Sequence, residues 1–161
     1  MDNHVLYSFD PSLACTGWAV WLGGRLLDCG YIKTAAKDPL DTRILAVAEC
    51  NISDLVPDEL ALEWPEVYRG GSRKGANPND LLPVSAVAGA LVVEYGIGGN
   101  CTFYKPRQWK GNVGKDVMVN RVLNRLDEDE LKVYTGKGMP KTYAHNAADA
   151  IGVGLKHLGR L

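Results

Sequence analysis

Three short apolar runs at the start of the chain predict three antiparallel strands. The run HVLYSFD (4–10) ends in an acid, and GWAVWL (17–22) is rich in aromatic and β-branched residues. Gly23-Gly24 follows the second run, and the tight turns that join hairpin strands need the positive φ that glycine adopts readily. We therefore expect a hairpin whose strands lie at 17–22 and 25–32, with the strand at 4–10 beside it.

Later segments change the hydrophobic period and predict helices that alternate with two more strands. Apolar residues recur at three- and four-residue spacing after Pro39, and Asn79 can cap a helix with Pro83 near its first turn. The expected elements are a helix from 39–41 to about 55, a strand at 59–64, a helix at 79–95, a strand at 100–105, and helices at 115–125 and 143–158. The glycine-rich basic stretch within 127–142 predicts irregular structure there.

This order of elements predicts an α/β fold, a five-stranded mixed sheet flanked by helices, in one domain covering 1–161. The chain of 161 residues is long enough to bury a core, and 46% apolar with 23% charged residues is ordinary for a soluble protein. No run is long enough for a membrane span, and no secretory signal opens the chain, so we expect a cytoplasmic protein. Four cysteines without CxxC spacing are expected to be packing residues.

Charge is distributed unevenly, although the net charge is only −1. Residues 1–63 carry 4 basic and 10 acidic side chains, whereas residues 64–126 carry 9 basic and 4 acidic ones. A polyanion responds to the local potential, so the basic middle third can bind phosphates while the acidic part lies elsewhere. This asymmetry is compatible with a nuclease that combines an acidic cluster with a basic surface.

Three acids occupy positions at which they could converge. Asp10 ends the first strand, Glu63 lies near the end of the fourth, and Asp149 lies inside the apolar run AADAIGVGL of the last helix. If the first helix crosses over between the first and fourth strands, the carboxyl ends of both strands meet, and a helix packed over them can add Asp149. Such like charges are costly unless cations neutralise them, and hard oxygen ligands suit Mg²⁺ or Mn²⁺. Each acid alone could instead be a turn residue or a solvated surface residue.

Five segments together resemble the RuvC family of Holliday junction resolvases, over nearly the whole chain and in the same order. They are FDPSLACTGWAV at 9–20, ALEWPEV at 61–67, LLPVSAVAGAL at 81–91, YKPRQWKGNVGK at 104–115 and HNAADAIGVGLKH at 145–157. The resemblance implies a ribonuclease H-like fold, a homodimer and two divalent metal ions, Mg²⁺ with Mn²⁺ as a substitute. It also implies cleavage of branched DNA by two-metal-ion phosphodiester hydrolysis, which leaves 5′-phosphate and 3′-hydroxyl ends.

The resemblance carries Asp10, Glu63 and Asp149 over as metal ligands, with Asp10 bridging both ions. One departure concerns the fourth position, where family members place an acid or a His about one turn before the last Asp. Here Asn146 lies three residues and His145 four residues before Asp149, so both can share a helix face with it. Asn146 could supply a neutral carbonyl ligand, whereas His145, which we favour, could bind a metal or carry a proton. A solvated or helix-capping His145 is the alternative.

Basic and aromatic residues of the middle third are the expected DNA contacts. Lys110 and Lys115 match lysines of the family before and at the start of the third helix, and the further candidates are Arg107, Arg69, Arg73, Lys74 and the aromatic wedge Tyr68. Solvated surface cations are the competing interpretation. Trp64 and Trp109 are expected to be packing residues. The small-residue helix at 79–95 either forms the dimer interface or only packs against the sheet.

Two other functions compete with junction resolution. One is a ribonuclease H or flap nuclease on the same fold, since fold alone does not determine substrate. The other is a junction-binding module that no longer cuts, which Asn146 in place of an acid would allow. The three acids favour the catalytic interpretation.

Overall fold

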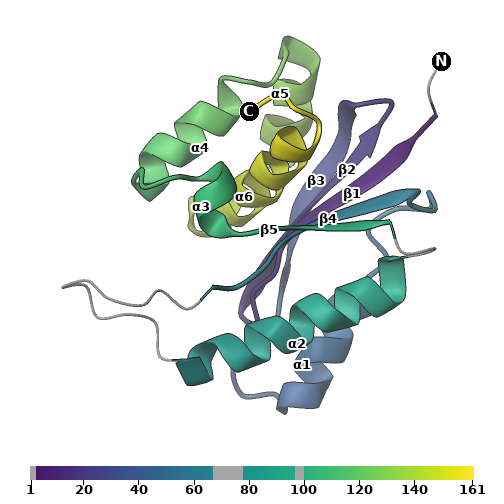
Figure 1. Cartoon of the computed structure of the whole chain (residues 1–161), viewed down its shortest axis with the longest axis vertical. Helices are drawn as coiled ribbons and strands as arrows, with labels where there is room; N and C mark the ends of the chain where they lie inside the picture. Colours follow the sequence, from purple (N-terminus) through teal and green to yellow (C-terminus); the bar gives the residue numbers. More distant parts are fainter. Residues whose placement is uncertain (1–2, 67–77, 97–99) are drawn as a thin grey trace.

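Five strands form one mixed sheet in the order β3-β2-β1-β4-β5 (Figure 1). This computed structural model describes residues 3–66, 78–96 and 100–161. The strands are β1 (Val5–Asp10), β2 (Cys15–Leu22), β3 (Arg25–Lys33), β4 (Glu59–Glu63) and β5 (Cys101–Tyr104). β2 is antiparallel to both β1 and β3, whereas β4 is parallel to both β1 and β5. The predicted five-stranded mixed sheet is confirmed.

The hairpin between β2 and β3 forms where the paired glycines predict it. Gly23 and Gly24 have φ angles of 56° and 79°, and Leu22 pairs with Arg25 across the turn. Both glycines therefore adopt the left-handed conformation that side chains disfavour. The pairing register shifts between Val20 and Trp21, so the hairpin is locally irregular.

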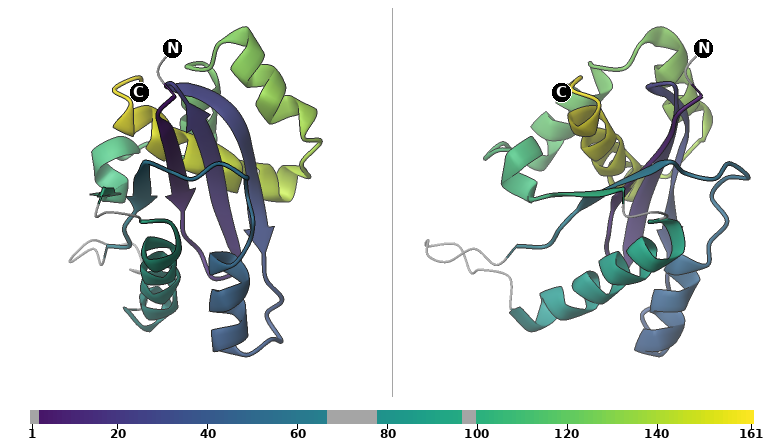
Figure 2. Two further views of the ribbon diagram at one scale, coloured as in Figure 1. Left: turned by 90° about the vertical axis from the view of Figure 1, so that its right-hand side faces the viewer. Right: turned by 45° about the vertical axis from the view of Figure 1, so that its right-hand side comes forward.

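Helices cover both faces of the sheet (Figures 1 and 2). One face carries α1 (Leu40–Ala48) and α2 (Pro78–Tyr95). The other face carries α3 (Pro106–Trp109), α4 (Lys115–Leu123), α5 (Glu128–Gly136) and α6 (Lys141–His157), of which α6 lies across the sheet. Each sheet face therefore has its own hydrophobic core.

Three details of the predicted helices were wrong. The stretch expected to be irregular contains α5, because Asp127 accepts hydrogen bonds from the backbone of Asp129 and Glu130, and the Glu130 side chain returns to the Asp127 backbone. This reciprocal capping starts a helix even in a highly charged segment. The first helix ends at Ala48 rather than near 55, and Pro83 lies inside α2, beyond its first turn.

Strict alternation along β1 divides its side chains between the two cores. Val5, Tyr7 and Phe9 pack into the core beneath α1 and α2, whereas Leu6 packs into the core beneath α6. Successive side chains of a strand point to opposite faces, so the even-numbered residues of β1 point toward α6. Asp10 is the last of them, and this places it on the face that α6 covers.

Candidate active site

The ends of β1 and β4 bring two carboxylates together. The two strands are parallel, and Phe9 pairs with Leu62, so Asp10 and Glu63 are the next residues on neighbouring strands. Leu60 and Leu62 pack toward α1 and α2, whereas Ala61 packs beneath α6, so alternation puts Glu63 on the same face as Asp10. The crossover that the sequence predicted thus places both acids at the carboxyl ends of β1 and β4.

α6 adds the third acid through a close approach to the sheet. Ser8 Oγ donates a hydrogen bond of 2.9 Å to the carbonyl of Ala150, which fixes the helix over β1 next to Asp149. Gly17, the antiparallel partner of Asp10, has no room for a side chain, because a Cβ there would overlap the backbone carbonyl of Asn146. The Thr-Gly pair of β2 therefore lets α6 lie close enough to bring Asp149, 9% exposed, to the other two acids.

Lys110 lies among the three acids. Its Nζ is 3.1 Å from Glu63 Oε2 and 3.6 Å from Asp149 Oδ2. The neighbouring Trp109 donates a 2.6 Å hydrogen bond from Nε1 to the same Glu63 oxygen. The side chain of Lys110 is only 25% exposed, so one ammonium group balances part of the negative charge from within the protein.

Burial and mutual repulsion perturb the charged groups of this cluster. Burial raises the pKa of Asp10 well above its usual range, and the charges of Glu63 and Asp149 raise it further while Lys110 opposes them. Burial also raises the pKa of Asp149, against the opposing effect of Lys110. Burial alone would lower the pKa of Lys110, but the three carboxylates outweigh it and raise that pKa. The raised pKa values show that the charged forms of these acids are disfavoured where they lie, and an added cation would favour them.

The structure distinguishes His145 from Asn146. Burial and the positive charge of Lys115 lower the pKa of His145, while the charge of Asp149 opposes them, so the imidazole is electrostatically coupled to the acid cluster. Asn146 instead donates from Nδ2 to Cys15 Sγ on β2 (3.2 Å) and to the carbonyl of Tyr143 (3.2 Å). These contacts use the NH₂ group of Asn146 and leave the assignment of its carbonyl oxygen as a ligand a prediction, as is the role of His145.

The predicted DNA contacts fall into three groups. Lys110 lies inside the acid cluster, and Lys115, the exposed first residue of α4, is close enough to help lower the pKa of His145 and to oppose the rise in the pKa of Asp149. Arg107 is exposed on α3. The remaining candidates, Tyr68, Arg69, Arg73 and Lys74, lie outside the described residues. Two basic side chains therefore adjoin the acids, and a third is accessible on a neighbouring helix.

Sequence reasoning assigned Trp109 to packing and missed its contact with Glu63. The ring is buried, with 3% exposed, and packs in the core beneath α6. A buried indole N–H usually has a hydrogen-bond acceptor, so a tryptophan one residue before a candidate site lysine was a usable signal. What the sequence did not contain was the identity of that acceptor.

The donor set of the cluster consists of carboxylate oxygens, the ligand type that Mg²⁺ and Mn²⁺ prefer. In the described parts of the chain, no three His, Cys, Asp or Glu side chains converge closely enough to coordinate one ion. Two of the acids contact the Lys110 ammonium, which is itself a cation between them. The residues therefore fit divalent ions by their chemistry, with Lys110 in the position of a counter-ion.

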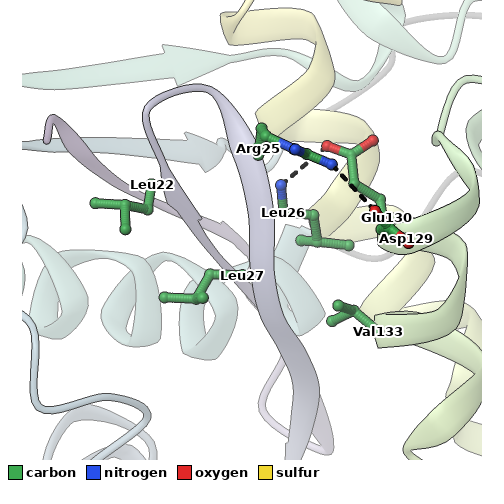
Figure 3. Close-up of a pocket in the computed structure, with 7 residues that line it drawn as sticks. All are labelled: Leu22, Arg25, Leu26, Leu27, Asp129, Glu130 and Val133. Atoms are coloured by element: carbon green, nitrogen blue, oxygen red, sulfur yellow. Dashed lines mark hydrogen bonds and ion pairs between the residues drawn. The ribbon is translucent and has the colours of Figure 1, made fainter. Parts of the chain in front are cut away.

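A separate cavity of about 260 Å³ lies between the β2–β3 hairpin and α5 (Figure 3). Its lining includes Leu22, Leu26 and Val133, and its carboxylate Glu130 accepts a hydrogen bond from the backbone N–H of Leu26. Arg25 on the rim is paired with Asp129 (3.7 Å). The polar groups drawn there pair with one another, so this cavity offers little chemistry compared with the acid cluster.

The comparisons with known proteins agree with the geometry of the acid cluster. No family profile matches the chain. The chain is 28% identical, over 95% of its length and 96% of the relative's, to the crossover junction endodeoxyribonuclease RuvC of Sphingopyxis alaskensis. It superposes on T. thermophilus RuvC in complex with a Holliday junction substrate with a TM-score of 0.66 and 25% identity, covering 96% of this chain and 92% of that one. A second structure of Thermus thermophilus RuvC gives a TM-score of 0.62 at 23% identity, with 95% and 92% covered. The ribonuclease H-like fold expected from the sequence is confirmed.

No helix in the described ranges has the length and apolar character to cross a membrane.

Proposed function

We propose that this chain, RuvC-like in sequence and fold, is a structure-selective DNA endonuclease that resolves Holliday junctions. The observation that carries the proposal is the convergence of Asp10, Glu63 and Asp149 at the ends of β1 and β4 beneath α6. The name of the Sphingopyxis relative gives the activity, and the Thermus complex gives the substrate. Resolution of junctions is a step of DNA recombination and repair, and we place it in the cytoplasm.

Two divalent ions, Mg²⁺ or Mn²⁺, are the proposed cofactors, with Asp10, Glu63 and Asp149 as the residues that would hold them. When bound, such ions would activate a water molecule and stabilise the negative charge on the leaving 3′ oxygen. The products of this hydrolysis would carry 5′-phosphate and 3′-hydroxyl ends. The support is the excess negative charge of the cluster, which one lysine balances only in part. Burial and the charges of both other acids raise the pKa of Asp10, so an added cation would stabilise its carboxylate.

Basic residues next to the acids would orient the scissile phosphate. Lys110, whose ammonium group lies beside Glu63 and Asp149, could also contact a phosphate oxygen there. Lys115 and Arg107 extend this basic surface along α4 and α3. Burial and the charge of Lys115 lower the pKa of His145, which favours the neutral imidazole, and this ring could accept a proton near Asp149.

A homodimer would supply two such sites to the two strands that are cut. α2 presents an exposed apolar stripe at helical spacing, formed by Leu82 (67% exposed), Ala86 and Val93 (88% exposed). A second copy packing on this stripe would bury it, and two-fold symmetry matches the near two-fold symmetry of a four-way junction. Sedimentation of Val93→Glu tests this, because a charge in the interface should shift a dimer to monomer. A dimer that is unchanged would move the interface elsewhere.

The deciding experiment offers the purified protein a labelled four-way junction, a matched linear duplex, a flap and an RNA–DNA hybrid, each with Mg²⁺, Mn²⁺ or EDTA. Paired metal-dependent nicks in the junction, absent from the duplex and from Asp10→Asn, are expected. Equal cleavage of flap and junction would widen the substrate to branched DNA, and preference for the hybrid would indicate a ribonuclease H. Tight junction binding without cleavage in either metal would reduce the protein to a binding module.

A further inference from the structure

Two glycines of α6 each accommodate a tryptophan ring from another element. A Cβ at Gly152 would overlap the six-membered ring of Trp109, and a Cβ at Gly154 would overlap the indole of Trp21. Both indoles are buried, at 3% and 0% exposed. The two glycines are two residues apart in the helix, so they point to different sides of α6, where Gly152 accommodates Trp109 of α3 and Gly154 accommodates Trp21 of β2.

The two indoles differ in the group that receives their N–H. Trp21 Nε1 donates to Ser8 Oγ at 2.9 Å, and Ser8 in turn donates to α6. Trp109 Nε1 donates at 2.6 Å to Oε2 of Glu63, the acid at the end of β4. The Trp21 bond joins neutral groups within the core, whereas the Trp109 bond reaches a carboxylate of the candidate site.

Trp109 contacts both signs of charge in that site. Its ring lies 4.5 Å from Lys110 Nζ, measured to the ring centroid, and its N–H holds the Glu63 oxygen that Lys110 also contacts. A hydrogen bond to an ionised acceptor is shorter and stronger than one between neutral groups. With Oε2 engaged by the indole, rotation of the Glu63 carboxyl group is restricted.

We propose that Trp109 is a positioning residue, whose N–H orients the Glu63 carboxylate for a divalent cation and whose ring is seated by Gly152. The inference rests on the proposed function, because it concerns how one of the proposed ligands is presented. An apolar residue of the same size would fill the space but would leave the carboxylate without this donor. Partners that hydrogen-bond to metal ligands typically change metal affinity by about 10- to 100-fold when removed.

The test compares Trp109→Phe with Trp21→Phe, since both replace a buried indole that donates one hydrogen bond to a ring without a donor. Mn²⁺ binding is measured without DNA by electron paramagnetic resonance, alongside junction affinity in EDTA and the Mn²⁺ concentration that half-saturates cleavage. Trp109→Phe is expected to weaken Mn²⁺ binding about tenfold or more and to raise the half-saturating concentration equally. Junction affinity in EDTA and kcat at saturating Mn²⁺ should stay within a few-fold of wild type.

Trp21→Phe, the matched control, is expected to lower thermal stability while leaving Mn²⁺ affinity unchanged. Gly152→Ala supplies an independent variant that displaces the Trp109 ring and should also weaken Mn²⁺ binding. Wild-type Mn²⁺ affinity in Trp109→Phe, or equal losses in both Phe variants, overturns the positioning role. Wild-type protein that binds Mn²⁺ but cuts no branched DNA contradicts the proposed function alone, since the contrast in Mn²⁺ affinity between the two variants remains measurable.

Discussion

Two regions of this molecule bury carboxylates, and their surroundings shift the pKa values of these acids in opposite directions. Glu130, 1% exposed, accepts hydrogen bonds from two nitrogens of Arg160 (2.8 and 2.6 Å) and from the backbone N–H groups of Leu26 and Asp127. Although burial opposes ionisation, these donors lower the pKa of Glu130 to about 2. Asp10, in contrast, meets two other acids and one shared lysine, and its pKa is raised.

The difference separates an acid with a structural role from the acids that we propose as metal ligands. Glu130 has donors for both of its oxygens within the protein, so it ties α5 to β3 and to Arg160. The acids at the ends of β1 and β4 lie close to one another, and their mutual repulsion raises the pKa of Asp10, so an additional cation would stabilise their charged forms. Burial alone therefore does not identify a catalytic acid, whereas the balance between burial and donors does.

The largest expected effect is the loss of cleavage in Asp10→Asn. Removing the charge of this proposed metal ligand should lower single-turnover cleavage of a labelled junction by about 10³-fold, since metal-based charge stabilisation contributes several kcal/mol. The metal-free protein should be as stable as wild type in urea, or more stable, because a repelled charge is removed. Cleavage within tenfold of wild type would show that Asp10 is dispensable, and the contrast between Asp10 and Glu130 would no longer hold.

Glu130→Gln should show the reverse pattern. Breaking this ion pair removes the carboxylate partner of the Arg160 guanidinium, which is 30% exposed and keeps two backbone acceptors, so the free energy of unfolding should fall by about 2–3 kcal/mol. Cleavage per folded molecule should be unchanged, because the residue lies on α5, away from the acid cluster. Glu128→Gln is the matched control, since this acid of the same helix has an 88% exposed side chain and should change stability little.

Acid titration sharpens the same distinction. Because the folded-state pKa of Glu130 lies at about 2, below its ordinary value of 4.5, the stability that it contributes is fully present above about pH 4.5. That contribution should be lost progressively as the pH falls from about 4.5 to 2, and it amounts to about 3 kcal/mol. Urea unfolding at a series of pH values measures it. If Glu130→Gln and wild type differ equally at pH 6 and pH 2.5, the ionised state of Glu130 is not the cause.

The smallest expected effect concerns the basic edge of the acid cluster. Lys115→Ala should reduce the slope of log K against log salt for junction binding by about one unit and weaken binding several-fold. Lys156→Ala, an exposed lysine in the last turn of α6, is the control and should leave the slope unchanged. Equal slopes for Lys115→Ala and wild type would make Lys115 a solvated surface charge.

The sequence predicted the fold and the three acids because both follow from local rules. Alternation along β1 and β4 fixes which face Asp10 and Glu63 occupy, and an acid within an apolar helix, Asp149, needs partners. The position of Lys110 did not follow from such rules. It depends on α3, which is a single turn, and on the ring of Trp109, which fits only because Gly152 of α6 has no side chain.

α5 was missed although a local rule, the capping box, predicts the start of a helix there. Asp127 and Glu130 form a capping box at the start of this helix, but the many charges and the later glycines favoured an irregular interpretation. Between His145 and Asn146, sequence spacing allowed both, and the contact of the Asn146 NH₂ group with Cys15 leaves its carbonyl oxygen available. The assignment of catalytic roles to these residues stays a prediction until the variants are measured.

The placement of α6 also has a consequence for how the protein is made. Ser8 and Ala150, joined by a hydrogen bond, are 142 residues apart, and α6 is the last element that the structure describes. Contacts between such distant segments form late in folding, because the loop between them must first close. On a ribosome, the chain would emerge with Asp10 and Glu63 long before Asp149. An unfinished or truncated chain would thus have no assembled cutting site, and this would protect DNA from a nuclease that is still being synthesised.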